Sequence, residues 1–138
     1  MILLDTSGLL SALDSSQTHL ERAATSLASA HPPRLLSPFV LAELDYLIAS
    51  RAAYAARVSL LEEVKHGVYT LEPMAAGDVA SAQAIIERYA DLGISLADAS
   101  IVVLARRHRV RDVLTLDERH FRVLNVDGQP FRLLPADA

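Results

Sequence analysis

The apolar runs of this chain are short, and they alternate with longer segments of helical periodicity. We expect strands over residues 2–4, 35–36, 68–71, 113–116 and 131–134. Such alternation is typical of α/β folds, in which right-handed crossovers place helices on both faces of a parallel sheet. Because 138 residues fit one core and contain no linker or internal repeat, we predict a single domain over residues 1–138.

Local signals mark where several helices begin. Ser37 can accept free amide hydrogen bonds and Pro38 tolerates the first helical position. Ser95 is a similar cap, and Thr6 and Ser7 are candidate caps of the first helix. The helix that begins at Pro38 is apolar nearly all round, so we expect it to be buried. The expected helices cover residues 9–13, 18–30, 38–49, 52–66, 77–92 and 96–108.

Four carboxylates stand at the ends of these apolar elements. Asp5 and Asp117 end the first and fourth expected strands, Glu43 lies about a turn into its helix, and Asp98 lies in the first turn of another. In a parallel α/β sheet, ligands gather beyond the carboxyl ends of the strands, where loops lead into helix N-termini. We therefore expect all four carboxylates to face one pocket.

Burial of these carboxylates needs compensation. Ionised carboxylates are seldom buried unless they are paired or hold a metal ion, and clustering raises the pKa of each. A divalent cation would neutralise the cluster. An all-oxygen ligand set favours Mg²⁺ or Mn²⁺ over zinc. The chain has no cysteine and no apolar run long enough to cross a membrane, so we expect a soluble cytoplasmic protein.

Each carboxylate also has a purely structural interpretation. Asp98, three residues after a helix cap, completes a capping box, Asp5 can initiate a helix, and Asp117 resembles a turn aspartate. Asp45 lies on the same helix as Glu43 and competes with it for a place in the site. Only the convergence of all four carboxylates favours a functional site over these separate roles.

The charge of the chain is unevenly distributed. A net charge of −4 argues against nucleic-acid binding through overall positive charge, yet arginines crowd one late segment. Arg106, Arg107 and Arg109 occupy the last turn of a helix, where they are either solvated cations that suit the helix dipole or ligands of RNA phosphates. The five histidines are dispersed, and we assign none of them to a metal site or to catalysis.

Four segments, taken together and in this order, match a known family. They are Ile2-Leu3-Leu4-Asp5-Thr6-Ser7, Ser37-Pro38 through Ala42-Glu43-Leu44, Leu96-Ala97-Asp98-Ala99-Ser100, and Val113-Leu114-Thr115-Leu116-Asp117 followed by Phe121. In this ordered set the chain resembles PIN-domain proteins, and among them the VapC-type toxins of bacterial toxin–antitoxin pairs. The resemblance covers essentially the whole chain.

The resemblance implies a Rossmann-like parallel sheet flanked by helices on both faces, and the activity of a metal-dependent endoribonuclease. One or two Mg²⁺ or Mn²⁺ ions would be held by Asp5, Glu43, Asp98 and Asp117. Hydroxyls beside these carboxylates, which would orient them or a water molecule, belong to Thr6, Ser7 and Thr115. It also implies cleavage of transfer RNA or a ribosomal RNA loop to inhibit translation, a homodimer, and a small VapB-type antitoxin that blocks the site.

Competing functions are less consistent with the sequence. A phosphatase of the haloacid-dehalogenase type needs a second aspartate where Ser7 stands, and a receiver domain needs a lysine near a late strand end, whereas Lys65 lies in a mid-chain helix. Neither the dinucleotide glycine pattern nor the phosphate-loop pattern occurs. The serious alternative is a non-catalytic PIN-like module that binds RNA or a partner protein.

Overall fold

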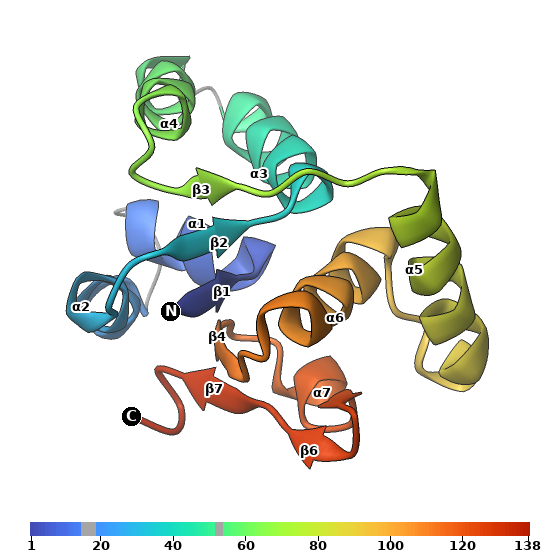
Figure 1. The fold of residues 1–138 in the computed structure, drawn as a ribbon. Coiled ribbons are helices and arrows are strands. Elements are labelled where there is room, and N and C mark those ends of the chain that lie inside the picture. Colours follow the sequence, from blue (N-terminus) through green and yellow to red (C-terminus); the bar gives the residue numbers. More distant parts are fainter. Residues whose placement is uncertain (15–18, 52–53) are drawn as a thin grey trace.

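Five short parallel strands form the central sheet of the computed structural model, which describes residues 1–14, 19–51 and 54–138 (Figure 1). The strand order is β3-β2-β1-β4-β7. The strands are β1 (Ile2–Leu4), β2 (Arg34–Leu36), β3 (Thr70–Leu71), β4 (Asp112–Leu114) and β7 (Arg132–Leu134). The predicted parallel sheet is confirmed. After β3 the chain crosses back to the other side of β1, where β4 and then β7 are added.

Strand β1 occupies the centre of the sheet. Ile2 pairs with Arg34 of β2 on one side, and Leu3 pairs with Val113 of β4 on the other. All three residues of β1 are buried, as expected for a parallel strand covered on both faces. The carboxyl ends of β1 and β4 therefore lie side by side, and the residues that follow these two strands meet at one edge of the sheet.

Helices cover both faces of this sheet (Figure 1). Helix α2 lies on one side, and α6, with α5 packed outside it, lies on the other. The helices are α1 (Thr6–Leu13), α2 (Leu20–Ser29), α3 (Pro38–Ser50), α4 (Tyr54–Lys65), α5 (Ala76–Arg88), α6 (Leu96–His108) and α7 (Glu118–Phe121), with a 3₁₀ turn η1 (Ala90–Leu92). Among the described residues, no helix is long and apolar enough to cross a membrane.

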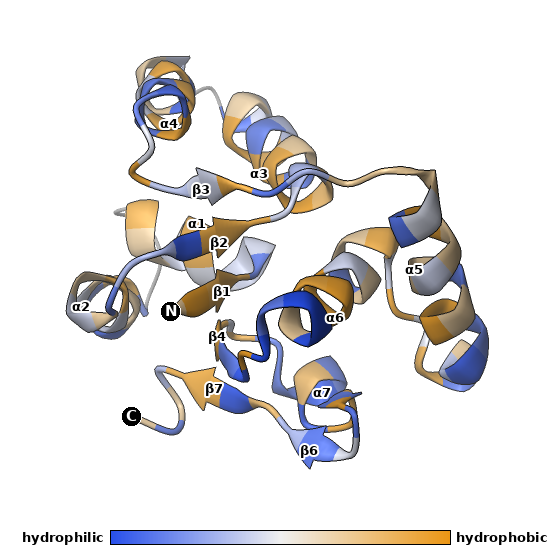
Figure 2. Ribbon diagram, in the orientation of Figure 1, coloured by the Kyte–Doolittle hydropathy of each residue, from blue (hydrophilic) through white to orange (hydrophobic). Residues whose placement is uncertain are grey.

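Helix α6 is the core helix of the fold. The residues from Ala97 to Ala105 are all buried, whereas Leu96 at the start of the helix and Arg106 and Arg107 in its last turn are exposed. Figure 2 shows the hydrophobic strands β1 and β2 beside α6 and the hydrophilic end of that helix. Its predicted bounds are confirmed, because Ser95 caps it and Arg109 ends it with a left-handed backbone at φ 55°.

Helix α3 is not buried all round, so that prediction was wrong. Only Val40, Leu44 and Ile48 are buried, whereas Tyr46 is 72% exposed. The helix contacts α1, α4 and α6, and Phe39, Leu41 and Leu47 are only partly buried against the core. Ser37 caps it as predicted, accepting a hydrogen bond from the amide of Phe39.

Several element boundaries also differ from the sequence-based expectations. The first helix begins at Thr6, so Thr6 and Ser7 lie inside it instead of capping it. The strands expected over 68–71 and 113–116 are shorter, and the helices expected to begin at residues 18 and 52 have those first residues outside the described ranges. A hairpin of β5 (Asn125–Val126) and β6 (Gln129–Pro130) was not predicted, although its turn, Asp127-Gly128, has the positive φ angles of a tight hairpin turn.

Gly8 is the point at which α1 touches the end of β4. A Cβ atom on Gly8 would lie 2.2 Å from the carbonyl oxygen of Leu114 and 2.7 Å from the amide nitrogen of Thr115. We predict that Gly8→Ala lowers the free energy of unfolding by about 3 kcal/mol, because overpacking against backbone cannot be relieved by a rotamer change. Urea unfolding measures this change.

The matched control for this substitution is Gly77→Ala. Gly77 lies in the first turn of α5, and a Cβ there would meet nothing within 4 Å. Alanine at this position should leave the stability unchanged or raise it by up to about 1 kcal/mol. Equal unfolding free energies for the two variants would contradict the close approach of α1 and β4.

Candidate metal centre

Asp5 stands at the end of β1 with its carboxylate almost fully buried. The residue is 4% exposed, and its Oδ2 accepts hydrogen bonds from the Thr115 hydroxyl at 2.6 Å and the Ser7 hydroxyl at 2.8 Å. The two donors come from α1 and from the segment after β4. The carboxylate is therefore fixed in one orientation by groups more than one hundred positions apart in the chain.

Ser7 and Thr115 also hold the backbone that leads to Asp117. The Ser7 hydroxyl accepts a hydrogen bond from the amide of Leu116 at 3.0 Å, and the Thr115 hydroxyl accepts one from the amide of Asp117 at 2.9 Å. Both side chains lie beside a carboxylate, where the sequence placed them. The buried hydroxyl of Thr6, in contrast, makes no hydrogen bond with any described residue and so orients no carboxylate.

Asp98 is held by a reciprocal capping box at the start of α6. The Ser95 hydroxyl accepts a hydrogen bond from the Asp98 amide at 3.1 Å, and Asp98 Oδ2 accepts one from the Ser95 amide at 3.0 Å. The structural interpretation of Asp98 as a cap is thus confirmed. It does not exclude a second role, because the same carboxylate lies beside His120.

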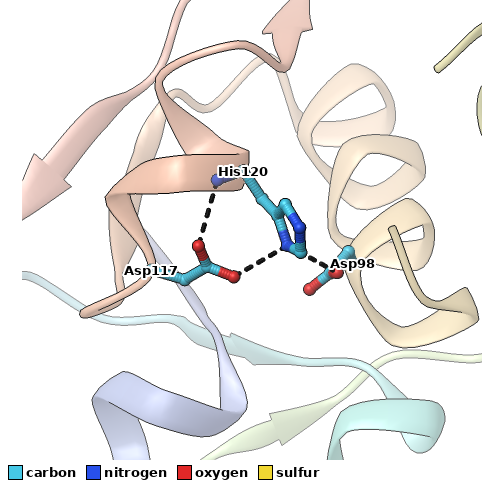
Figure 3. Close-up of side chains that lie close together, drawn as sticks. All are labelled: Asp98, Asp117 and His120. Carbon is cyan, nitrogen blue, oxygen red and sulfur yellow. Dashed lines mark hydrogen bonds and ion pairs between the residues drawn. The ribbon is translucent and has the colours of Figure 1, made fainter. Parts of the chain in front are cut away.

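Asp117 and His120 complete a cluster with Asp98 (Figure 3). Asp117 caps α7, with Oδ1 accepting a hydrogen bond from the His120 amide at 3.0 Å. Its Oδ2 lies 2.8 Å from His120 Nδ1, which in turn lies 3.4 Å from Asp98 Oδ2. One donor atom from each of the three residues lies within 4.8 Å of the others.

His120 is the member of this cluster that the sequence analysis missed. Its Nδ1 is buried and within ion-pair distance of both carboxylates, yet it meets hydrogen-bond geometry with no described residue. The available signal was its position three residues after Asp117, because residues three apart on a helix share a face. Without knowledge that a short helix begins at residue 118, this spacing carries little weight.

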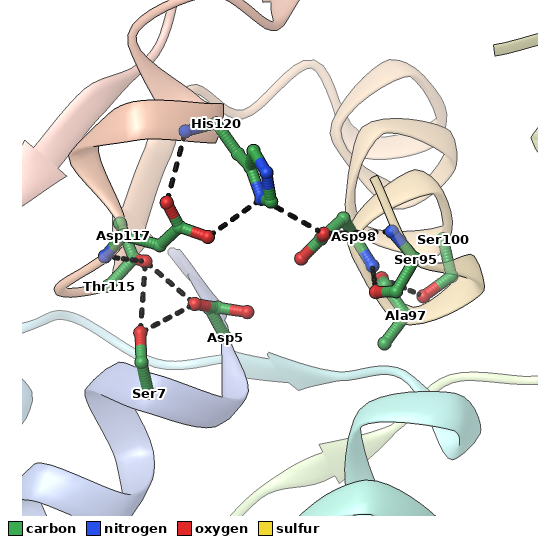
Figure 4. A network of polar contacts seen from close by, with 9 residues as sticks. All are labelled: Asp5, Ser7, Ser95, Ala97, Asp98, Ser100, Thr115, Asp117 and His120. Carbon is green, nitrogen blue, oxygen red and sulfur yellow. Dashed lines mark hydrogen bonds and ion pairs between the residues drawn. The ribbon is translucent and has the colours of Figure 1, made fainter. Parts of the chain in front are cut away.

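Asp5 lies next to this cluster (Figure 4). One of its oxygens points to Ser7 and Thr115, and the other points toward Asp98. Burial raises the pKa of Asp5 to about 6, the two hydroxyl hydrogen bonds oppose this shift, and the negative charge of Asp98 adds to it. Three carboxylates that face one another in this way fit a divalent cation, and the buried nitrogen of His120, which makes no hydrogen bond with a described residue, strengthens that fit.

Glu43 and Asp45 of α3 have different surroundings. Asp45 forms a two-point ion pair with Arg57, with 2.7 Å between Oδ1 and Nε and 3.1 Å between Oδ2 and Nη2. Glu43 is exposed and makes no hydrogen bond or ion pair with the described part of the chain. Asp45 is therefore occupied by Arg57, and Glu43 is the carboxylate of α3 that is available to a ligand.

The arginines at the end of α6 lie away from the carboxylates. Arg107 lies nine positions after Asp98, which corresponds to about 13 Å along a helix. It contacts Glu72 and Asp78, and Arg106 lies 3.4 Å from Asp127. The positive charge of these two arginines is thus shared with acidic neighbours, and Arg109 forms the end of the helix.

Comparison with known proteins identifies the family of this chain. The family model of the PIN domain matches residues 2–125. The chain belongs to the PIN-domain family. It is 37% identical over 135 residues to the ribonuclease VapC26 of Mycobacterium tuberculosis, an alignment that covers 97% of this chain and 100% of that protein. The predicted membership of the VapC-type PIN domains is confirmed.

Two solved structures share the fold of this PIN domain. VapC20 of Mycobacterium tuberculosis, described as a sarcin-ricin loop cleaving toxin, has a TM-score of 0.79 at 22% identity and covers 85% of this chain and 90% of its own. FitAcB from Neisseria gonorrhoeae has a TM-score of 0.63 at 26% identity and covers 96% and 97%. The first similarity supports the fold alone.

The buried carboxylate of Asp5 generates a prediction about pH. Its pKa of about 6 in the folded protein exceeds the ordinary value of 3.8, so the folded state binds the proton more tightly than the unfolded state does. Stability should fall as pH rises from about 4 to about 6, with a cost of roughly 3 kcal/mol at pH 7. An asparagine side chain does not ionise, so we expect Asp5→Asn to stabilise the metal-free protein at pH 7 and to lose that advantage near pH 4.

Urea unfolding in a chelating buffer at pH 4 and pH 7 measures this effect. The control is Asp91→Asn, which changes an exposed aspartate of η1 and should leave the pH dependence of the unchanged protein intact. A variant at Asp5 with the same pH dependence as this control would disprove the burial penalty.

Proposed function

We propose that this PIN domain is a divalent-metal-dependent endoribonuclease and the toxin of a type II toxin–antitoxin pair. The observation that carries the proposal is the approach of Asp98 and Asp117, which with His120 offer donor atoms within 4.8 Å of one another, beside the buried carboxylate of Asp5. The similarity to the ribonuclease VapC26 extends over nearly the whole chain and supports the reaction class. The cation is Mg²⁺ or Mn²⁺, the ions that carboxylate oxygens favour.

The residues around the proposed metal site would bind the ion and hold its carboxylate ligands in place. A bound divalent ion would polarise the scissile phosphoryl group and activate water. The hydroxyls of Ser7 and Thr115 fix one oxygen of Asp5 and leave the other for the cation. The capping box at Ser95 fixes Asp98 through Oδ2, the oxygen that also lies beside His120. Because these orientations exist before a ligand binds, little reorganisation is needed during the reaction.

Glu43 is the proposed fourth carboxylate. Its helix is anchored next to α6 by the buried hydroxyl pair of Ser37 and Ser100, whose oxygens lie 2.6 Å apart. The ion pair of Asp45 with Arg57 supports the choice of Glu43 over Asp45. The alternative function, a PIN-like module that binds RNA or protein without catalysis, does not need an available carboxylate here. Absence of Mn²⁺ binding in calorimetry would favour that alternative.

A cleavage assay with purified protein, total RNA and Mn²⁺ tests the proposed activity. We predict that Asp98→Asn lowers the cleavage rate by about 100-fold or more, the loss expected for removal of a single charge-stabilising group. Glu43→Gln should also lower it, whereas Asp45→Asn should not, since Asp45 is paired with Arg57.

The structure offers a matched control for the capping role of Asp98. Asp78 occupies the same third position of α5, and its Oδ2 accepts a hydrogen bond from the Ala75 amide at 2.9 Å. Asp78→Asn perturbs a helix cap in the same manner but lies at no carboxylate cluster. It also weakens the ion pair with Arg107 but keeps that arginine, so its cleavage rate should stay within a few-fold of that of the unchanged protein. If both variants lose activity equally, Asp98 acts only as a cap.

The RNA target is proposed to be transfer RNA or a ribosomal RNA loop, with the arginines at the end of α6 as contacts to its backbone. We predict that the double variant Arg106→Glu and Arg107→Glu weakens RNA binding and lowers its dependence on salt concentration. Filter binding of total transfer RNA between about 50 and 200 mM salt measures the slope. An unchanged slope would assign both arginines to their ion pairs with Asp127, Glu72 and Asp78.

The proposed partners are a second copy of the chain and a small VapB-type antitoxin. Large apolar side chains stand exposed on the paired helices α3 and α4, where Tyr46 is 72% and Tyr54 is 75% exposed. Val58 and Leu61 of α4 are also exposed. An apolar segment of a partner would cover such a surface. Light scattering of the purified chain, alone and with its co-expressed antitoxin, tests both partners.

A further inference from the structure

The His120 ring is placed as a ligand would be, and the carboxylate set described above leaves it without a function. Its Nδ1 lies between Asp98 and Asp117, is buried, and forms no properly oriented hydrogen bond with the described residues (Figure 3). Two carboxylates that face a nitrogen at such short distances can be satisfied in two ways. Either the ring nitrogen carries a proton, or a metal ion is shared by all three groups.

The distances fit the second possibility. Ligands bind Mg²⁺, Mn²⁺ or Zn²⁺ at about 2.0–2.2 Å, so adjacent ligands of an octahedral ion lie about 3 Å apart and opposite ligands about 4.3 Å apart. His120 Nδ1 is 2.8 Å from the oxygen of Asp117 and 3.4 Å from that of Asp98, and the donor atoms of all three lie within 4.8 Å. These separations match the edges of a coordination shell.

The segment that carries His120 is held firmly. Its amide donates a hydrogen bond to Asp117, and the next residue, Phe121, is fully buried with its ring 5.5 Å from that of Phe131 in an edge-to-face contact. Arg122 then pairs with Asp137 at 2.7 Å. The imidazole is therefore preorganised, which is the condition for a ligand that adds affinity without a cost of ordering.

We propose that His120 Nδ1 is a ligand of the metal centre and that this nitrogen makes the centre prefer Mn²⁺ to Mg²⁺. The inference rests on the proposed metal-dependent function and adds one ligand to its carboxylates. Mg²⁺ is bound mostly by oxygen and loses its water reluctantly. Mn²⁺ also favours oxygen ligands, but as a first-row transition metal it accepts an imidazole nitrogen more readily than Mg²⁺ does. A nitrogen donor therefore raises affinity for Mn²⁺ more than affinity for Mg²⁺.

Calorimetric titration of the chelator-treated protein with Mn²⁺ alone and Mg²⁺ alone tests the preference. We expect the unchanged protein to bind Mn²⁺ at least about 10-fold more tightly than Mg²⁺. His120→Asn keeps a polar group near the position of Nδ1 but removes the imidazole, so Mn²⁺ affinity should fall about 10-fold while Mg²⁺ affinity changes by less than about 3-fold. His66→Asn is the control, because the exposed His66 follows the end of α4 and lies 3.1 Å from Glu62, and it should change neither affinity.

Electron spin echo spectroscopy of the Mn²⁺ complex provides a second readout that does not depend on the folding of a variant. A directly bound imidazole nitrogen modulates the echo of the unchanged protein, and the modulation should disappear in His120→Asn. Absence of nitrogen modulation in the unchanged protein overturns the inference. An unaltered Mn²⁺ to Mg²⁺ preference in the variant does the same, and His120 is then an ion-pair partner of the carboxylates.

The outcomes separate this inference from the proposed function. Asp98→Asn should abolish binding of both ions, because it removes a carboxylate that both need. If the unchanged protein binds both ions, Asp98→Asn abolishes binding and His120→Asn changes neither affinity, the carboxylate centre is supported and the nitrogen ligand is rejected. If the unchanged protein binds neither ion, the proposed function itself fails together with this inference.

Discussion

The buried carboxylate of Asp5 is the constraint around which the rest of this structure is arranged. It follows the central strand and is almost fully buried, and two hydroxyl donors from α1 and from the segment after β4 compensate part of the lost hydration. The same two hydroxyls hold the backbone that carries Asp117. The hydrogen bonds that offset part of the cost of burying Asp5 thus also fix the backbone at the edge of the sheet.

Capping and ligand binding use the same side chains in this protein. Asp98 satisfies the start of α6 and Asp117 satisfies the start of α7, and each carboxylate still presents an oxygen toward His120. A cap interpretation and a functional one are therefore not alternatives. The caps hold these carboxylates in fixed positions, and their remaining lone pairs are free to bind a ligand.

Much of this arrangement could be predicted from the sequence, and the physical reasons for success and failure are distinct. Strand-end positions placed Asp5 and Asp117 at one edge, and the capping box fixed the start of α6, because these features depend on local pattern and parallel topology. Burial of α3 was overpredicted, because an apolar composition does not reveal which faces a neighbour covers. His120 was missed because its place depends on a helix of only four residues.

The pairing of β1 with β4 affects the order in which this protein folds during synthesis. The hydrogen bond between Thr115 and Asp5 joins residues 110 positions apart, and β4 must insert beside β1 before it can form. A growing chain that has reached the end of α6 already contains Asp5, Glu43 and Asp98. At that stage β1 is paired on one side only, because β4 has not yet been made. Closure of so long a loop comes late in folding. During synthesis, Asp117 therefore cannot join Asp5 and Asp98 until β4 has left the ribosome.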